Sequence, residues 1–194
     1  MDGYYFERLP ADAVPRDLRS RTHEVVEFVC ADLNLSPPPE VVWIRPVTRD
    51  SATEILNRWK ENHKHPIPVG SRSPVMRYAK DITEGYTPPG PPNEIWIRSG
   101  LSDLPKLEFI AAHETRHIWQ KRPANGGKYD DECTAEGDAY PYGYAILTKY
   151  LTATRQLTPR IAAEVNEKRD SRRSAFLQEW PEAAPKWSDF EIDL

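Results

Sequence analysis

The chain has 194 residues, of which 39% are hydrophobic and 29% charged, and its formal net charge is −4. This length and apolar content allow one domain with a buried core and exclude disorder throughout the chain. The basic residues of 167–173 are interleaved with acids and form no patch of one sign, so no nucleic-acid partner is expected.

The N-terminal segment, residues 1–15, has neither the basic start nor the apolar run of a secretory signal peptide. No stretch of the sequence approaches the roughly 18 consecutive apolar residues that a membrane-spanning helix needs. The sequence therefore predicts a soluble, cytoplasmic protein without a membrane partner.

The N-terminal third predicts a helix, a strand and a second helix, in that order. Apolar residues recur at helical spacing over 15–35, and the segment "SPPPE" ends this helix. The β-branched and aromatic run at 41–47 is typical of a strand. Residues 49–64 predict a second, weaker helix, with Asp50 or Ser51 at its start.

The middle of the chain predicts long loops around short strands. Residues 65–92 are rich in proline and glycine, with one short strand expected at 75–82. Residues 93–99 alternate, with two isoleucines on one face and Trp96 on the other, which indicates a half-buried or edge strand. An edge here would let an extended peptide add to the sheet, with Trp96 either lining a cleft or packed in a core.

The C-terminal half predicts three helices. They cover 104–121, then 132–151 despite an internal proline, then 158–180, where Thr158 is the expected N-cap. The tail at 181–194 is expected to be irregular.

The two cysteines, Cys30 and Cys133, lie about a hundred residues apart and form no CxxC pair. This spacing excludes a thiolate zinc ribbon and a dithiol redox site, and two reduced thiols are expected.

The segment "HETRH" within the 104–121 helix carries the strongest chemical signal. His113 and His117 are four residues apart, so on a helix they project from one face and can reach one ion. Glu114 lies one step around the same helix, where it can act on the attacking water. Zinc suits imidazole ligands at this spacing. The alternative is a surface helix with two solvated histidines.

A catalytic zinc needs a third protein ligand. No histidine follows His117, and the metzincin extension would need glycine at 120 and histidine at 123, where the chain has Gln120 and Pro123. The third ligand should therefore be a downstream carboxylate. The candidates are Glu132, Glu136 and Asp138, and each is also a candidate hydrogen-bond acceptor for a ligand histidine.

Residues 136–143, "EGDAYPYG", fit the pattern E-x-x-A-x-x-[FY]-[AG], nineteen residues beyond His117. In these residues the chain resembles the gluzincin metallopeptidases, above all the minimal ImmA/IrrE-like zincins. The resemblance covers about 93–147 and implies one zincin-like α+β domain over 1–194, a small twisted sheet packed against the motif helix and further helices. It also implies Glu136 as the third ligand, with Glu132 in reserve. Asp138 fits the aspzincin pattern only with the aspartate one position early.

The resemblance implies a zinc metallopeptidase that hydrolyses a peptide or protein substrate with Glu114 as general base. A second group must stabilise the oxyanion, and the sequence leaves the choice open. The candidates are Arg116, Tyr129, Tyr140, Tyr142 and the pair His63 and His65. Two other functions stay open: a zincin-fold regulatory protein with metal but little general proteolysis, and a structural helical domain with an accidental motif.

Overall fold

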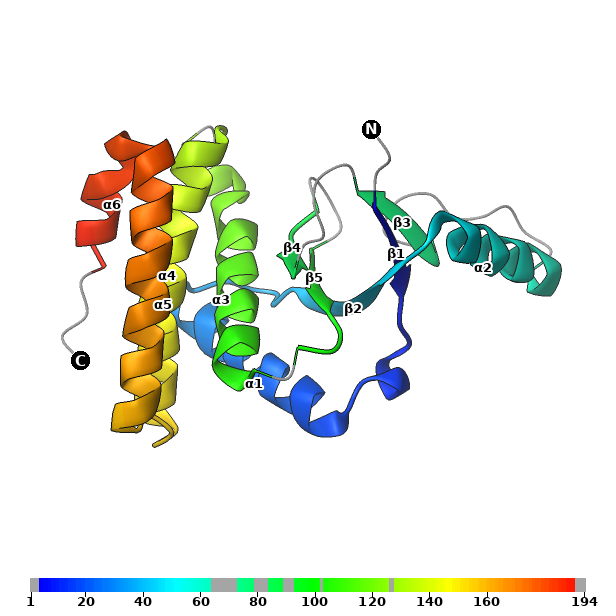
Figure 1. Cartoon of the computed structure of the whole chain (residues 1–194), viewed down its shortest axis with the longest axis horizontal. Coiled ribbons are helices and arrows are strands. Elements are labelled where there is room, and N and C mark those ends of the chain that lie inside the picture. Colours follow the sequence, from blue (N-terminus) through cyan, green and yellow to red (C-terminus); the bar gives the residue numbers. More distant parts are fainter. Residues whose placement is uncertain are drawn as a thin grey trace.

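A computed structural model of the chain describes residues 4–63, 73–78, 84–88, 93–101, 103–125 and 128–190. Helices and a small sheet form an α+β fold, as the sequence predicts (Figure 1). The strands are β1 (Tyr4–Arg8), β2 (Glu40–Val47), β3 (Val75–Tyr78), β4 (Gly85–Tyr86) and β5 (Glu94–Arg98). The helices are α1 (Arg16–Asp32), α2 (Arg49–Asn62), α3 (Leu104–Gln120), α4 (Glu132–Ala153), α5 (Pro159–Glu179) and α6 (Ala184–Ser188).

The five strands form one sheet in the order β3-β1-β2-β5-β4. Strands β2 and β5 run parallel, and the other pairs are antiparallel. Of the two alternatives predicted for β5, half-buried or edge, the edge strand is wrong, because β4 pairs with its outer side through Gly85–Ile97 and Tyr86–Trp96. A two-residue strand inside a proline- and glycine-rich segment has too few positions for an alternating pattern to reveal it.

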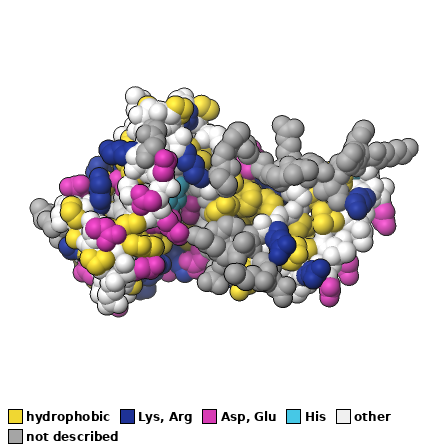
Figure 2. All heavy atoms as spheres, turned by 90° about the horizontal axis from the view of Figure 1, so that it is seen from above, with side chains coloured by type: hydrophobic (Ala, Val, Ile, Leu, Met, Phe, Trp, Pro, Cys, Tyr) yellow, Lys and Arg dark blue, Asp and Glu magenta, His cyan; other side chains and the backbone are white. Residues whose placement is uncertain are grey.

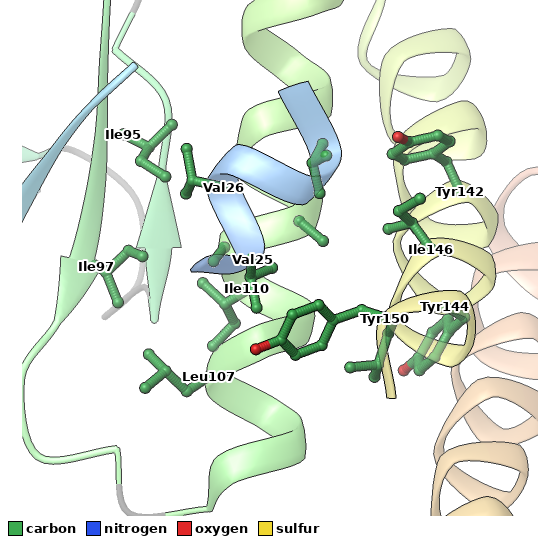
Figure 3. Close-up of a cluster of buried hydrophobic side chains, with 14 of the residues drawn as sticks. Val25, Val26, Ile95, Ile97, Leu107, Ile110, Tyr142, Tyr144, Ile146 and Tyr150 are labelled. Carbon is green, nitrogen blue, oxygen red and sulfur yellow. The ribbon is translucent and has the colours of Figure 1, made fainter. Parts of the chain in front are cut away.

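The two faces of the sheet pack into two separate cores. Ile95 and Ile97 point from β5 toward α1 and α3, as Figure 3 shows, and belong to the main core. Trp96 points to the other face and is 7% exposed, within a smaller cluster that includes Phe6, Val42, Ile44 and Met76. Trp96 is therefore a core residue of this smaller cluster.

Helix α3 is buried on both sides, because it lies between the sheet and α4 (Figure 1). Leu107, Ala111 and Ala112 are fully buried along it. A fully buried leucine or isoleucine contributes roughly 1.5–3 kcal/mol relative to an exposed one, so this packing fixes the helix firmly. Helices α4 and α5 follow as further layers, and Thr158 caps α5 as predicted, accepting from the Ile161 amide.

The prediction of an irregular tail is wrong for residues 181–188. Residues Pro181–Ala183 form a 3-10 turn, and α6 follows directly. Trp187 is 4% exposed and packs near Phe176 of α5, with ring centroids 6.2 Å apart. A five-residue helix is too short for a periodic pattern, so only the buried tryptophan marks it.

Cys30 and Cys133 are both free, in agreement with the prediction. Within the described ranges, no helix combines the length and apolar character needed to cross a bilayer.

Candidate metal centre

Helix α3 brings the two motif histidines together, one turn apart on the same face. Their Nε2 atoms lie 3.1 Å apart, and the rings are perpendicular with centroids 4.7 Å apart. Only 9% of the His113 side chain and 12% of the His117 side chain are exposed. The pair is therefore not the solvated surface pair of the alternative interpretation.

Helix α4 places the carboxylate of Glu136 beside the two histidines. Glu136 places Oε2 3.1 Å from His113 Nε2 and Oε1 3.3 Å from His117 Nε2. The ligand atoms of these three residues all lie within 4.8 Å of one another. The close approach of the helices needs Gly143, where a Cβ atom would lie 2.9 Å from Cε2 of Phe109 on α3.

The N-terminus of α4 fixes where Glu136 falls. Asp131 is the N-cap, and its carboxylate accepts the backbone N–H of Thr134 at 2.7 Å. Glu136 then lies in the second turn, on the side that faces α3. Glu132 lies one turn earlier and lines the cleft, outside the cluster of three ligand residues.

The cluster could hold a metal ion, and its geometry fits one. Four ligands at about 2.0–2.2 Å around a tetrahedral ion lie about 3.3–3.6 Å from one another. The two Nε2 atoms lie 3.1 Å apart, and they lie 3.1 and 3.3 Å from the two different oxygens of Glu136, slightly closer than that spacing. In addition, Oε2 of Glu136 is buried beside His113 Nε2 and has a lone pair that a cation could take.

The contacts of the cluster keep its carboxylate ionised. Burial disfavours the charged carboxylate, but hydrogen bonds and charge from His113 and His117 outweigh burial and hold the pKa of Glu136 well below its usual range. Burial lowers the pKa of His117, yet its hydrogen bond to Glu136 and the nearby acidic charges raise it overall. Glu136 is therefore ionised at neutral pH, as a metal ligand must be.

A hydrogen-bond chain orients His117. Its Nδ1 lies 2.7 Å from Oε1 of Gln120, and an amide oxygen only accepts, so Nδ1 carries a proton. In the neutral imidazole, the form that binds a metal, Nε2 then has the lone pair. The Gln120 amide donates in turn to Asp138 Oδ2 at 2.8 Å and to the Ala135 carbonyl at 2.9 Å. Nδ1 of His113 is buried and has no such partner within the described part of the chain.

Asp138 faces away from the cluster and supports it from behind. It is 2% exposed and accepts two hydrogen bonds from Arg116, at 2.7 and 3.0 Å. The Arg116 guanidinium lies over the rings of Trp119 and Tyr142, 4.0 and 4.5 Å from their centroids. Asp138 therefore serves as an acceptor behind the ligands and is not a ligand itself.

Contacts in the structure rule out several candidates for the group that stabilises the oxyanion. Arg116 donates its hydrogen bonds to Asp138, and the Tyr142 hydroxyl donates to Asp32 at 3.0 Å. His63 stacks on Trp59 of α2, on the far side of the sheet from α4 (Figure 1). His65 lies outside the described residues. Tyr129 and Tyr140 remain, since both line the cleft.

Tyr140 is the better placed of these two. It follows Glu136 by one turn on α4, and its ring centroid lies 4.5 Å from that of His113. Burial raises the pKa of Tyr140 to about 12, with Arg172 opposing the shift, so its hydroxyl keeps its proton at neutral pH. It can therefore donate a hydrogen bond.

Glu114 is held by the segment that contains β4. The Thr87 hydroxyl lies 2.7 Å from Oε2 of Glu114 and 2.9 Å from its backbone carbonyl oxygen. Lys121 anchors the segment, because its Nζ donates to the carbonyls of Thr87 and Pro88 at 2.8 and 2.9 Å. A Cβ at Gly85 would lie 2.8 Å from Oε1 of Glu114, so only glycine allows this approach.

The cluster opens into a cleft of about 1150 Å³ between β4, α3, α4 and α5. In the face seen from above in Figure 2, histidine atoms lie between acidic and basic side chains. Four supporting residues were missed by the sequence analysis: Gly85, Thr87, Gln120 and Lys121. Gln120 and Lys121 lie three and four residues beyond His117, a spacing that could have identified them as neighbours of the site.

No family model, no curated protein and no solved structure matches this chain. The interpretation of the cluster therefore depends on its geometry and on the chemistry of its donor atoms.

Proposed function

We propose that the protein is a zincin-like, zinc-dependent metallopeptidase that hydrolyses bonds in a peptide or protein substrate. The observation that carries the proposal is the convergence of His113, His117 and Glu136 within 4.8 Å, with Glu114 beside them in the cleft. A cytoplasmic location belongs to the proposal as well.

The donor set favours zinc over harder cations. Two imidazole nitrogens and one carboxylate form the three-ligand set of many catalytic zinc sites, whereas calcium and magnesium prefer oxygen ligands throughout. When bound, zinc supplies a Lewis acid that polarises the scissile carbonyl and lowers the pKa of water.

The chain's own residues supply the proton transfers. Glu114 accepts the proton of the attacking water and returns it to the leaving amine. Thr87 holds one oxygen of that carboxylate, so the other, Oε1, is left to receive the proton. The Tyr140 hydroxyl donates to the developing oxyanion, because it lines the cleft and keeps its proton at neutral pH.

The test compares the zinc-loaded wild type with Glu114→Gln and with a control at an exposed acid of α2, Glu61→Gln, on a library of peptides read by mass spectrometry. Loss of the general base should reduce cleavage by about 10²–10⁴-fold while zinc content stays unchanged. The control should cleave near the wild-type rate.

Equal rates for wild type and Glu114→Gln would contradict the assigned base. Zinc retained by a wild type that cleaves nothing would instead favour the zincin-fold regulatory protein.

A further inference from the structure

A second hollow, here called the side groove, adjoins the metal cleft. It has a volume of about 520 Å³ and lies between α3, α4 and α5. The side groove and the cleft share Glu84, Phe109, Ile110, Arg172 and Ala175 as lining residues. The two hollows therefore adjoin each other at these shared residues.

The walls of the side groove are apolar and aromatic. Phe109 and Tyr144 stack with ring centroids 4.3 Å apart, and Leu147 and Val165 line the groove beside them. Leu147 and Val165 are each 2% exposed, so they form part of a firm wall. Burial of a large apolar side chain of a ligand against such a surface is favourable, because it removes apolar area from water.

The cations at the rim of the groove are not equivalent. Lys106 is paired with Glu84 at 2.5 Å, and Lys168 is paired with Asp103 at 2.7 Å and Glu164 at 2.8 Å. Arg172 forms no ion pair with any residue in the described ranges.

The remaining acid of the groove, Glu167, does not neutralise Arg172. It precedes Arg172 by five positions on α5, about 140° around the helix axis, and although both residues line the groove they form no ion pair with each other. Arg172 is therefore the one cation lining the groove, within the described residues, that has no carboxylate partner.

Arg172 is held next to the metal cluster. Its guanidinium lies 4.8 Å from the centroid of the Tyr140 ring, and that ring lies 4.5 Å from the ring of His113. The contact with the aromatic face restrains the arginine over the point where cleft and groove meet. The planar guanidinium can then offer two parallel N–H donors, a geometry that matches a carboxylate.

We propose that Arg172 binds a carboxylate of the substrate at the junction of the cleft and the side groove. The substrate class is peptides that carry a bulky apolar side chain and a carboxylate on the same side of the scissile bond. The carboxylate is either an acidic side chain or a free C-terminus. This inference rests on the proposed peptidase function and names the substrate of the same site.

The test uses four sets of alanine-based hexapeptides with one leucine. The first set carries a glutamate near the leucine, and the second, the neutral set, has glutamine at that position. The third set has the glutamine but a free C-terminal carboxylate near the leucine. The fourth set has serine in place of the leucine. Cleavage and binding are measured for wild type, Arg172→Met, Arg172→Lys and the control Arg173→Met. Binding is also measured by calorimetry on zinc-loaded Glu114→Gln, with and without Arg172→Met.

Wild type should prefer a carboxylate peptide to the neutral peptide by about fivefold in kcat/KM, as expected for a partly exposed ion pair of about 1 kcal/mol. Arg172→Met should abolish this preference, Arg172→Lys should restore part of it, and Arg173→Met should leave it unchanged. The set that shows the preference identifies the source of the carboxylate. The serine set should be cleaved more slowly than the leucine sets.

Cleavage without any carboxylate preference, or a preference that survives Arg172→Met, would overturn the inference and leave the peptidase proposal intact. Conversely, carboxylate-dependent binding that requires Arg172, in a protein that cleaves no peptide, would support the recognition site and overturn the peptidase function. Absence of both cleavage and carboxylate-dependent binding would overturn both.

Discussion

The two sides of the metal cluster are built in different ways. On the helical side, α3 and α4 carry all three ligands, and a buried network of Gln120, Asp138 and Arg116 lies behind them. On the β4 side, Glu114 is oriented by one hydroxyl, that of Thr87, in a segment next to a two-residue strand. In the proposed function, metal binding and proton transfer therefore depend on different supporting residues, and substitutions of these residues should affect them separately.

The largest effect is expected on the helical side, from Asp138→Ala. This change leaves the buried Arg116 without its carboxylate, which typically costs about 3–5 kcal/mol of stability. Urea unfolding of the metal-free protein measures it, with exposed Asp130→Ala as control. A loss no larger than that of the control would show that the network does not hold α4 against α3.

The next effect is on metal affinity alone, from Gln120→Leu. Loss of the acceptor for His117 Nδ1 should weaken zinc binding by about 10- to 100-fold, as is typical when a partner of a ligand histidine is removed. Competition with a chromophoric chelator measures the affinity. Gln178→Leu, at an exposed position of α5, serves as control, and equal affinities in both variants would contradict the role of Gln120.

On the β4 side, Thr87→Val should have a smaller effect, and it should lower the catalytic rate instead of the zinc affinity. The side chain keeps its shape but loses the hydroxyl that holds Glu114, so kcat should fall by about five- to tenfold, equivalent to about 1–1.4 kcal/mol. Zinc affinity should not change. Thr87→Ser should restore the rate, and a Thr87→Val variant that loses zinc would contradict the separation of the two sides.

The last prediction concerns the pH dependence of stability and belongs to the helical side. The pKa of Glu136 lies below its ordinary value of 4.5 in the folded protein, so its ionised form stabilises the fold. That stability is complete above about pH 4.5, the value expected for the unfolded chain, and is lost as the pH falls through the lower folded value. Between pH 6 and pH 3, metal-free wild type should lose more stability than Glu136→Gln in chelator-containing buffer. Parallel losses would contradict the charge assigned to this carboxylate.

The helical side of the site could be predicted from the sequence, because helical periodicity places residues by simple spacing. His113 and His117 share a face by their separation of four, and the carboxylates of α4 were identified as the ligand candidates. The choice of Glu136 depended on a resemblance, since spacing alone does not show how α4 crosses α3. The crossing is set by contacts such as Gly143 against Phe109.

The β4 side could not be predicted in the same way. Gly85 and Thr87 lie about thirty positions before Glu114 in a segment without periodic pattern, and only the paired sheet brings them to it. The same limit explains why an edge position was considered for β5. It also explains α6, whose five residues are positioned by the burial of Trp187 and not by a repeat.

The most direct test of the central claim is the zinc content of the purified protein, measured by elemental mass spectrometry for wild type, His113→Ala, Glu136→Ala and the control Glu132→Ala. The account predicts about one zinc per chain in wild type and in Glu132→Ala, and a marked loss in the other two, as expected when one of three protein ligands is removed. Wild type that binds no metal even after zinc is added, or zinc retained in full by both ligand variants, would contradict the metal centre.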